Sequence, residues 1–428
     1  MSGSIPLKVG NMGLSDLRKR HHTARTRIGN RSVRRLALIL TMLLLSSCLT
    51  GIVDRALETS ANVVSGIKNL PSTVLPSQFE SSVYIDGDYN IPNASIEVDG
   101  AYVVLRTFFA TNRSVDENAQ PYGMFGAGRG NDVTYGKSYV ILRRSLDTFE
   151  IEPEYMIKMD IVDEPSEAAT LSHNEIFSRE DFSGDLNTAI NRSDNNSVLI
   201  YVHGFNVSFE EAAIRSAQLS YDIGFSGTTV FFSWPARGEY PTYIADVESA
   251  QASQQYFESM INDVLYLTSA NRIYLVAHGL GARLASRVMK SVLLTQPGFR
   301  SRVKELVLVA PDIDVNEFTE ELVPYIATVD SPVTVYAFGD DSSMAISKSL
   351  SDGIAVGDNS EGVVLVSRVE TIDAGGADAS LAAHSGFSDT SSILADIWDL
   401  IYNGSRANSR RLLTARYTSE GTYWEYTQ

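Results

Sequence analysis

Short apolar runs alternate with amphipathic stretches between residues 197 and 403. Each apolar run is continuous and bounded by polar turns, which is typical of strands buried on both faces of a parallel sheet. Such strands are expected at residues 198–202, 228–233, 272–277, 305–310, 332–338 and 363–369. Helical spacing of apolar positions predicts helices at residues 209–221, 246–267, 281–294 and 391–402. This alternation predicts an α/β fold with a doubly wound, mostly parallel sheet, whose ligand site lies at the carboxyl ends of the strands.

Residues 101–196 have a different pattern, and we expect them to form amino-terminal strands of the same domain. Aromatic-rich apolar segments at 101–109 and 138–142 predict two strands. The glycine-rich stretch between them, at 124–130, lacks the P-loop pattern and is not followed by a helical pattern. We therefore expect a cluster of turns there and not a phosphate-binding loop.

The first 47 residues have the pattern of an export signal. Basic side chains precede an uncharged apolar run at 36–45, and its roughly ten residues are too few to cross a bilayer of about 30 Å. The run ends in Leu-Ser-Ser-Cys at 45–48, which resembles the bacterial lipobox, where the cysteine thiol takes a diacylglyceryl group. We expect Cys48 to be the lipidated mature amino terminus, with translation starting at Met1 or Met12. Leu49 is not the Asp that retains such lipoproteins at the inner membrane, which implies the outer membrane, facing the periplasm.

The predicted organisation has five parts along the chain. They are a lipoprotein signal peptide at 1–47, a tether at 48–100, the amino-terminal strands at 101–196, the α/β core at 197–403 and a polar carboxyl-terminal tail at 404–428.

Composition excludes several classes of function. The chain has 428 residues, 44% of them hydrophobic, so it can bury a large core. Its formal net charge of −17 argues against nucleic-acid binding, because the phosphate backbone would repel it. The only cysteine is Cys48, which excludes a disulfide framework and a cysteine-ligated metal. The spacing of histidines and carboxylates does not match the H-E-x-x-H pattern, and we expect neither a metal nor a cofactor.

Two expected strand ends carry unusual chemistry. The first strand of the core runs into His-Gly-Phe-Asn at 203–206, where glycine lets the backbone turn and present an N–H group as an oxyanion hole requires. The third runs into Ala-His-Gly-Leu-Gly at 277–281, which has the shape of the G-x-S-x-G nucleophile elbow. The nucleophile position of this elbow is occupied by Gly279.

These stretches resemble a bacterial α/β hydrolase family of unknown function whose members are often lipoproteins. The likeness includes Phe-Ser-Trp-Pro at 232–235, Ala-Pro-Asp-Ile-Asp at 310–314 and, upstream, Phe-Ala-Thr-Asn-Arg at 109–113, and it covers about residues 101–403. The family's elbow reads A-H-S-M-G, so Gly279 replaces the nucleophilic serine and Leu280 a methionine.

The resemblance also implies the remaining site residues. It assigns the acid to Asp341, with Asp340 as a rival, and the base to His384. The chain order 279, 341 and 384 is that of α/β hydrolases. His384 would take the proton from a serine hydroxyl, Asp341 would orient the imidazole, and the N–H groups of Phe205 and Leu280 would form the oxyanion hole.

Each of these signals has a structural alternative. The first two core histidines, His203 and His278, fit buried packing positions as well as the site. The Asp340–Asp341 pair fits a solvated turn or helix cap. The aspartates Asp312 and Asp314 are expected to cap the next helix.

The expected function follows from the missing serine. A glycine cannot form an acyl-enzyme, and losing a triad nucleophile removes on the order of 10⁶ in rate. We expect a lipid-anchored, catalytically degenerate hydrolase of the bacterial envelope that binds a small molecule or an envelope protein. Two alternatives stay open: a weak esterase in which His384 and Asp341 activate a water, and an active esterase whose serine was replaced to trap a substrate.

Overall fold

The computed structural model describes residues 83–85, 89–91, 94–98, 102–119, 123–143, 169–237, 242–339, 353–375 and 392–426. The chain divides into two compact units, residues 1–70 and 71–428, and every described residue belongs to the second. Four of the candidate functional residues named in the sequence analysis lie outside the described ranges: Cys48, Asp340, Asp341 and His384.

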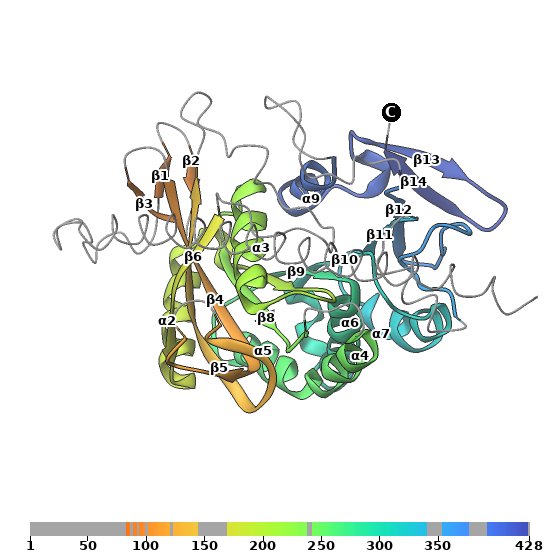
Figure 1. Cartoon of the computed structure of the whole chain (residues 1–428). Helices are drawn as coiled ribbons and strands as arrows, with labels where there is room; N and C mark the ends of the chain where they lie inside the picture. Colours follow the sequence, from red (N-terminus) through yellow and green to blue (C-terminus); the bar gives the residue numbers. More distant parts are fainter. Residues whose placement is uncertain are drawn as a thin grey trace, which may run out of the picture. The chain divides into compact units, whose positions relative to one another are not determined.

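A twelve-stranded sheet forms the centre of the second unit (Figure 1). Its parallel core follows the order β12-β11-β10-β9-β7-β8. These strands are β7 (Ser197–Val202), β8 (Thr228–Ser233), β9 (Arg272–His278), β10 (Val303–Val309), β11 (Val333–Ala337) and β12 (Val369–Asp373). The predicted α/β-hydrolase architecture is confirmed. The order of the strands reverses at β7, so the site-forming crevice is expected outside the carboxyl ends of β7 and β9.

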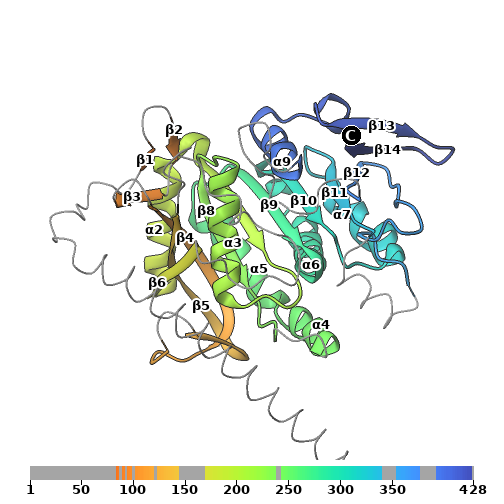
Figure 2. The same cartoon turned by 45° about the horizontal axis from the view of Figure 1, so that its top comes forward.

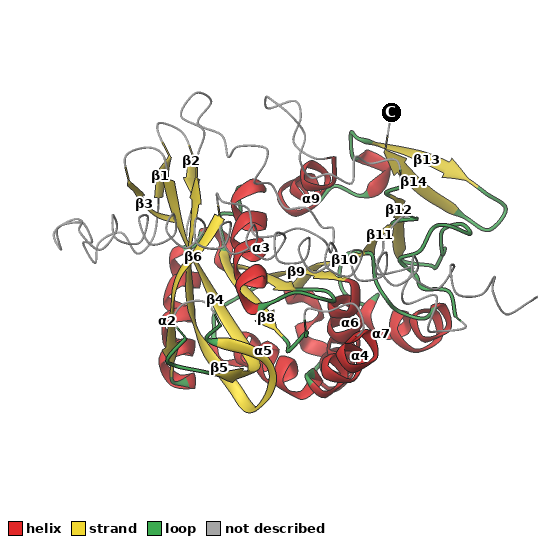
Figure 3. Cartoon of the chain, viewed as in Figure 1, coloured by secondary structure: helices red, strands yellow, loops and turns green. Residues whose placement is uncertain are grey.

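Helices cover both faces of this sheet (Figure 3). The side chains of β7 alternate between the two cores, with Ile200 in one and Tyr201 in the other, which explains its unbroken apolar run. One core is completed by α2 (Arg179–Arg192), α4 (Tyr243–Ala252), α5 (Gln254–Leu267), α6 (Gly279–Thr295) and α7 (Val323–Ile326). The other is completed by α3 (Phe209–Asp222) and α9 (Ser392–Asn403).

Two expected elements of the α/β core differ from the structure. The single helix predicted at 246–267 is divided at Ser253, whose hydroxyl donates to the carbonyl of Ser249 (2.7 Å) and accepts from the Asn112 amide (3.0 Å). The strand predicted at 363–369 begins only at Val369. The apolar residues Val364 and Val366 pack against the core from an irregular segment, and burial alone produced the strand-like pattern.

The amino-terminal strands extend the sheet beyond β8. Strand β4 (Tyr102–Val115) pairs in parallel with β8, and β5 (Phe125–Arg143), β6 (Ala169–Phe177) and β3 (Ala94–Val98) pair antiparallel around it. Strands β1 (Val83–Ile85) and β2 (Tyr89–Ile91) form a separate two-stranded sheet. The glycine-rich residues from Phe125 onward belong to β5, so the predicted cluster of turns is wrong.

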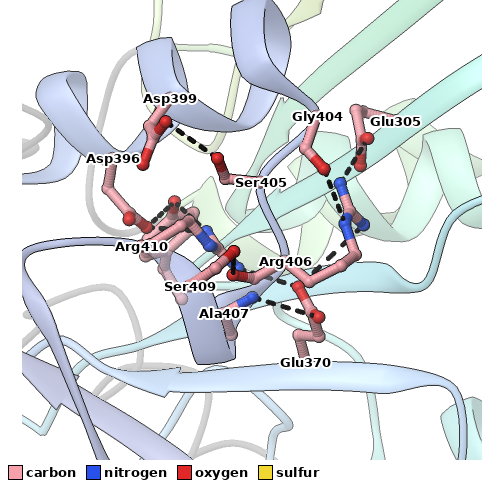
Figure 4. Close-up of polar contacts among 11 residues, drawn as sticks. Glu305, Glu370, Asp396, Asp399, Gly404, Ser405, Arg406, Ala407, Ser409 and Arg410 are labelled. Carbon is pink, nitrogen blue, oxygen red and sulfur yellow. Dashed lines mark hydrogen bonds and ion pairs between the residues drawn. The ribbon is translucent and has the colours of Figure 1, made fainter.

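The other end of the sheet is completed by the polar residues after 403. Here β13 (Leu413–Tyr417) and β14 (Thr422–Tyr426) form a hairpin, and β14 pairs in parallel with β12. A buried ionic network holds this segment (Figure 4): Arg410 contacts Asp396 of α9 at 2.7 Å and Glu370 of β12 at 2.8 Å. Short 3-10 turns lie at Asp194–Asn196, Pro297–Arg302 and Ala407–Ser409, and a π turn at Glu317–Leu322. None of the helices in the described ranges has the length and apolarity to span a membrane.

Candidate active site

A strand–turn–helix elbow joins β9 to α6, and Gly279 is its central residue. Its φ is +54°, the left-handed conformation that the nucleophile of such an elbow often adopts. A Cβ atom built on Gly279 would lie 3.6 Å from Cα of Gly204 and 3.9 Å from the backbone nitrogen of Phe205. Position 279 therefore faces the loop after β7, and Leu280 follows it in the first turn of α6, where N–H groups lack intrahelical partners.

The elbow packs closely on the loop after β7. A residue larger than glycine would clash at one position of the elbow and at one position of the loop. A Cβ atom on Gly281 would lie 2.1 Å from the carbonyl oxygen of His203, and one on Gly204 would lie 2.6 Å from Nδ1 of His278. Gly281 and Gly204 are thus required for close approach, whereas position 279 has room for a Cβ atom.

The loop after β7 is held from several sides. Its Asn206 is also left-handed, with φ +58°, and Ser208 begins α3 with a reciprocal capping box to Glu211. Burial raises the pKa of Asp246 in α4 to about 6, although backbone N–H groups of Arg237 and Asn206 hydrogen-bond to its carboxylate and lower it. A buried carboxylate therefore binds the backbone immediately after Phe205.

Asp312 lies beside the elbow and does not cap a helix as expected. Its N–H donates to the carbonyl of Gly279 (3.2 Å), and its carboxylate accepts a 2.5 Å hydrogen bond from the hydroxyl of Tyr243. The Tyr243 ring packs on Phe205 with centroids 5.5 Å apart. Asp314 does act as a cap, because its carboxylate accepts the N–H of Asn316 (2.8 Å).

His203 takes the packing position that the sequence left as an alternative. It is fully buried and stacks on Trp234 with ring centroids 5.0 Å apart. Its Nδ1 lies 2.9 Å from the carbonyl of Gly204, and its Nε2 lies 3.2 Å from the Ser233 hydroxyl and 3.4 Å from Nη2 of Arg113. Burial, followed by the Arg113 charge, holds its pKa well below the usual range, so the ring is neutral.

Sequence reasoning missed the role of Arg113 in this arrangement. Arg113 is 2% exposed and reaches the β7 loop from β4, about 90 residues earlier in the chain. Burial lowers its pKa to about 10, which leaves it charged at neutral pH. The only available signal was the family resemblance of the segments 109–113 and 232–235, which the structure brings into contact.

The described residues include only some members of the predicted site. The structure brings together Gly279, Leu280 and Phe205, while the expected acid and base lie outside the described residues. Within the described ranges, no group of three or more His, Cys, Asp or Glu residues could hold a metal ion.

The sheet and the elbow together define an α/β-hydrolase fold. Residues 178–367 match the model of a family described as "Alpha/beta hydrolase of unknown function (DUF900)", which supports the family resemblance. No curated protein matches the chain.

Solved structures match parts of the chain at low sequence identity. A putative cell surface hydrolase from Lactobacillus plantarum WCFS1 is 14% identical, with the match covering 50% of this chain and 95% of that one at a TM-score of 0.31. A chain from a study of two prolyl endopeptidases is 13% identical, with 64% and 35% covered and a TM-score of 0.26. The present chain thus spans about a third of that protein's length.

Proposed function

We propose that this protein is a catalytically degenerate α/β hydrolase that acts by binding, anchored to the bacterial envelope through lipid on Cys48. One observation carries the loss of catalysis: the elbow keeps its left-handed backbone and faces the Phe205 N–H, but residue 279 has no side chain. Without a hydroxyl there, no acyl-enzyme can form at this elbow.

Neighbouring serines do not replace the missing nucleophile. Ser233 touches an imidazole, but it is fully buried and its hydroxyl accepts from Arg113 Nε at 2.8 Å. Ser286 is 2% exposed and lies two turns into α6. Neither is accessible to a substrate carbonyl, so among the described residues around Gly279 neither of these serines can act as the nucleophile.

The binding function is supported by what the crevice keeps. A lost nucleophile leaves roughly 10³–10⁴ of rate acceleration in a triad enzyme, which comes from the oxyanion hole and substrate binding. The same groups can hold the carbonyl or carboxylate of a small molecule or of an envelope-protein segment without cleaving it. The competing proposal, a weak esterase in which His384 and Asp341 activate a water, requires measurable turnover.

The deciding experiment measures covalent labelling and turnover together. We expect the purified protein to hydrolyse p-nitrophenyl esters barely above background and to resist a fluorophosphonate probe. Stoichiometric labelling by the probe would reveal a nucleophile and refute the proposal. Turnover without labelling, abolished by His384→Ala, would instead support the activated-water esterase. A serine codon at position 279 of the natural gene would identify the glycine as a replacement.

A further inference from the structure

We propose that Arg113 is a positioning residue that fixes the loop carrying the Phe205 N–H. The inference rests on the proposed binding crevice, but it concerns a residue on a different strand, β4, which lies beside β8 and not beside the elbow (Figure 2).

The guanidinium of Arg113 binds three segments around the crevice. Its Nη2 donates to the carbonyl of Val207 (2.7 Å) and faces Nε2 of His203, both at the end of β7. At the end of β8, Nε donates to the Ser233 hydroxyl (2.8 Å), and just after this strand Nη1 donates to the carbonyl of Ala236 (3.2 Å). Nη1 also faces a carbonyl of β5 at 3.4 Å.

All five N–H groups of this side chain therefore have acceptors, and none of the acceptors is a carboxylate. The arginine therefore acts here through the directions of its hydrogen bonds, because the planar guanidinium fixes where its donors point. Lysine has three donors on one atom and cannot reach acceptors spread around the guanidinium.

The backbone around Arg113 is irregular in a way that permits these contacts. Thr111 pairs with Thr134 and Arg113 with Arg129, so two residues of β4 match five of β5. Such bulges re-aim a side chain. A Cβ atom on Gly130 would lie 2.9 Å from the Arg113 carbonyl oxygen, so the glycine allows β5 to approach the backbone of β4 closely at this residue. Gly126 and Gly128 lie against the side chain of Ser114 in the same way, so the glycine-rich stretch is explained by close packing of β5 on the end of β4.

A second buried charge binds the loop. Asp246 accepts the N–H of Arg237 at 3.0 Å and binds the N–H of Asn206, next to the oxyanion donor. The loop is thus bound by a cation through Val207 and by an anion through Asn206. Glu210 and Glu211 add attraction to the Arg113 charge. Backbone donors must be held to within about 0.5 Å to bind a ligand oxygen well. Nη2 of Arg113 contacts His203 before Phe205 and Val207 after it, so this arginine restrains both sides of the donor. Asp246 adds a contact on the later side only, through Asn206.

The test is hydrogen exchange measured by mass spectrometry on the full chain in detergent, for Arg113→Lys and Arg113→Met. We expect amides of residues 203–207 and 234–237 to exchange at least about tenfold faster, with α9 and β12 unchanged. The matched control is Arg410→Met, another buried arginine, which should accelerate exchange in α9 and β12 and leave 203–207 unchanged.

A folded Arg113→Lys protein with unchanged exchange in 203–207 would overturn the proposal, as would acceleration spread equally over the whole sheet. If both Arg113 variants fail to fold, Ser233→Ala removes one acceptor of the guanidinium. Exchange in this variant should then be accelerated less, and only in residues 203–207 and 234–237. Unchanged exchange in these segments would overturn the proposal. Exchange needs neither ligand nor turnover, so a protein that proves catalytic would refute the proposed function and leave this inference standing.

Discussion

Replacing Gly279 with serine tests whether the elbow has kept its geometry. The Cβ contacts at 3.6 and 3.9 Å are ordinary van der Waals distances, so the new Cβ atom needs no displacement of its neighbours. The cost is the backbone conformation: at φ +54° a residue with a Cβ atom is strained by about 1–2 kcal/mol. For a domain of this size, that loss lowers Tm by about 1–3 °C.

Two comparisons separate backbone strain from steric overlap. Gly279→Ala carries the same strain as Gly279→Ser without the hydroxyl, so the two should be equally stable in urea denaturation followed by circular dichroism. Gly281→Ala places its Cβ atom 2.1 Å from a carbonyl oxygen and should cost about 3 kcal/mol or more. If Gly279→Ala were as damaging as Gly281→Ala, the space described at position 279 would not exist.

The activity measured on the same variants tests the predicted triad. Gly279→Ser should hydrolyse p-nitrophenyl esters, Gly279→Ala should not, and adding His384→Ala to the serine variant should abolish the gain. The serine variant should tolerate Asp340→Ala but not Asp341→Ala. The reverse result would assign the acid to Asp340. A folded Gly279→Ser protein with no turnover would refute the reasoning that the surrounding site is competent.

Three further outcomes are expected. Cys48→Ala should lose incorporation of labelled fatty acid and membrane retention, and continued labelling would contradict lipidation at this residue. Burial raises the pKa of Asp222 to about 7, from about 4 in an unfolded chain. The contribution of this carboxyl group to the free energy of unfolding is therefore fully present below about pH 4, where the group is protonated, and is lost as pH rises to about 7. Asp222→Asn should therefore stabilise the protein at pH 8 by up to about 4 kcal/mol and have no effect at pH 4, in denaturation at both values. Arg410→Met leaves Asp396 buried without its cation and leaves Glu370 with only the more distant Arg406, at 4.0 Å. It should cost about 3–5 kcal/mol in urea, whereas a loss below about 1 kcal/mol would show that the network is dispensable.

The parallel core was predictable because its information is local. A strand such as β7 is buried on both faces, so an unbroken apolar run ended by His-Gly is visible in a window of ten residues. The elbow was also predictable, since the glycines required for close packing sit at fixed spacing in the chain.

The support of the site was not predictable, because it depends on pairs far apart in sequence. Arg113 meets Val207 and Ser233 across 94 and 120 residues, and a lone arginine in a strand pattern carries no sign of such partners. Asp312 was misassigned for a similar reason. An aspartate after a strand is a common helix cap, and only the tertiary structure brings Tyr243 to its carboxylate.

The pairing of β4 with β8 has a consequence for where this domain can be cut. The segment that matches the family model, residues 178–367, contains β7 to β11 but omits β4, β12 and β14. Expressed alone, it would expose backbone N–H and C=O groups along β8 at one edge and β11 at the other, each a template for pairing with another chain. It would also leave the acceptors of Arg113 around the crevice without their donor. A fragment starting at residue 178 is therefore expected to aggregate, and the smallest soluble unit must include residues 102–426.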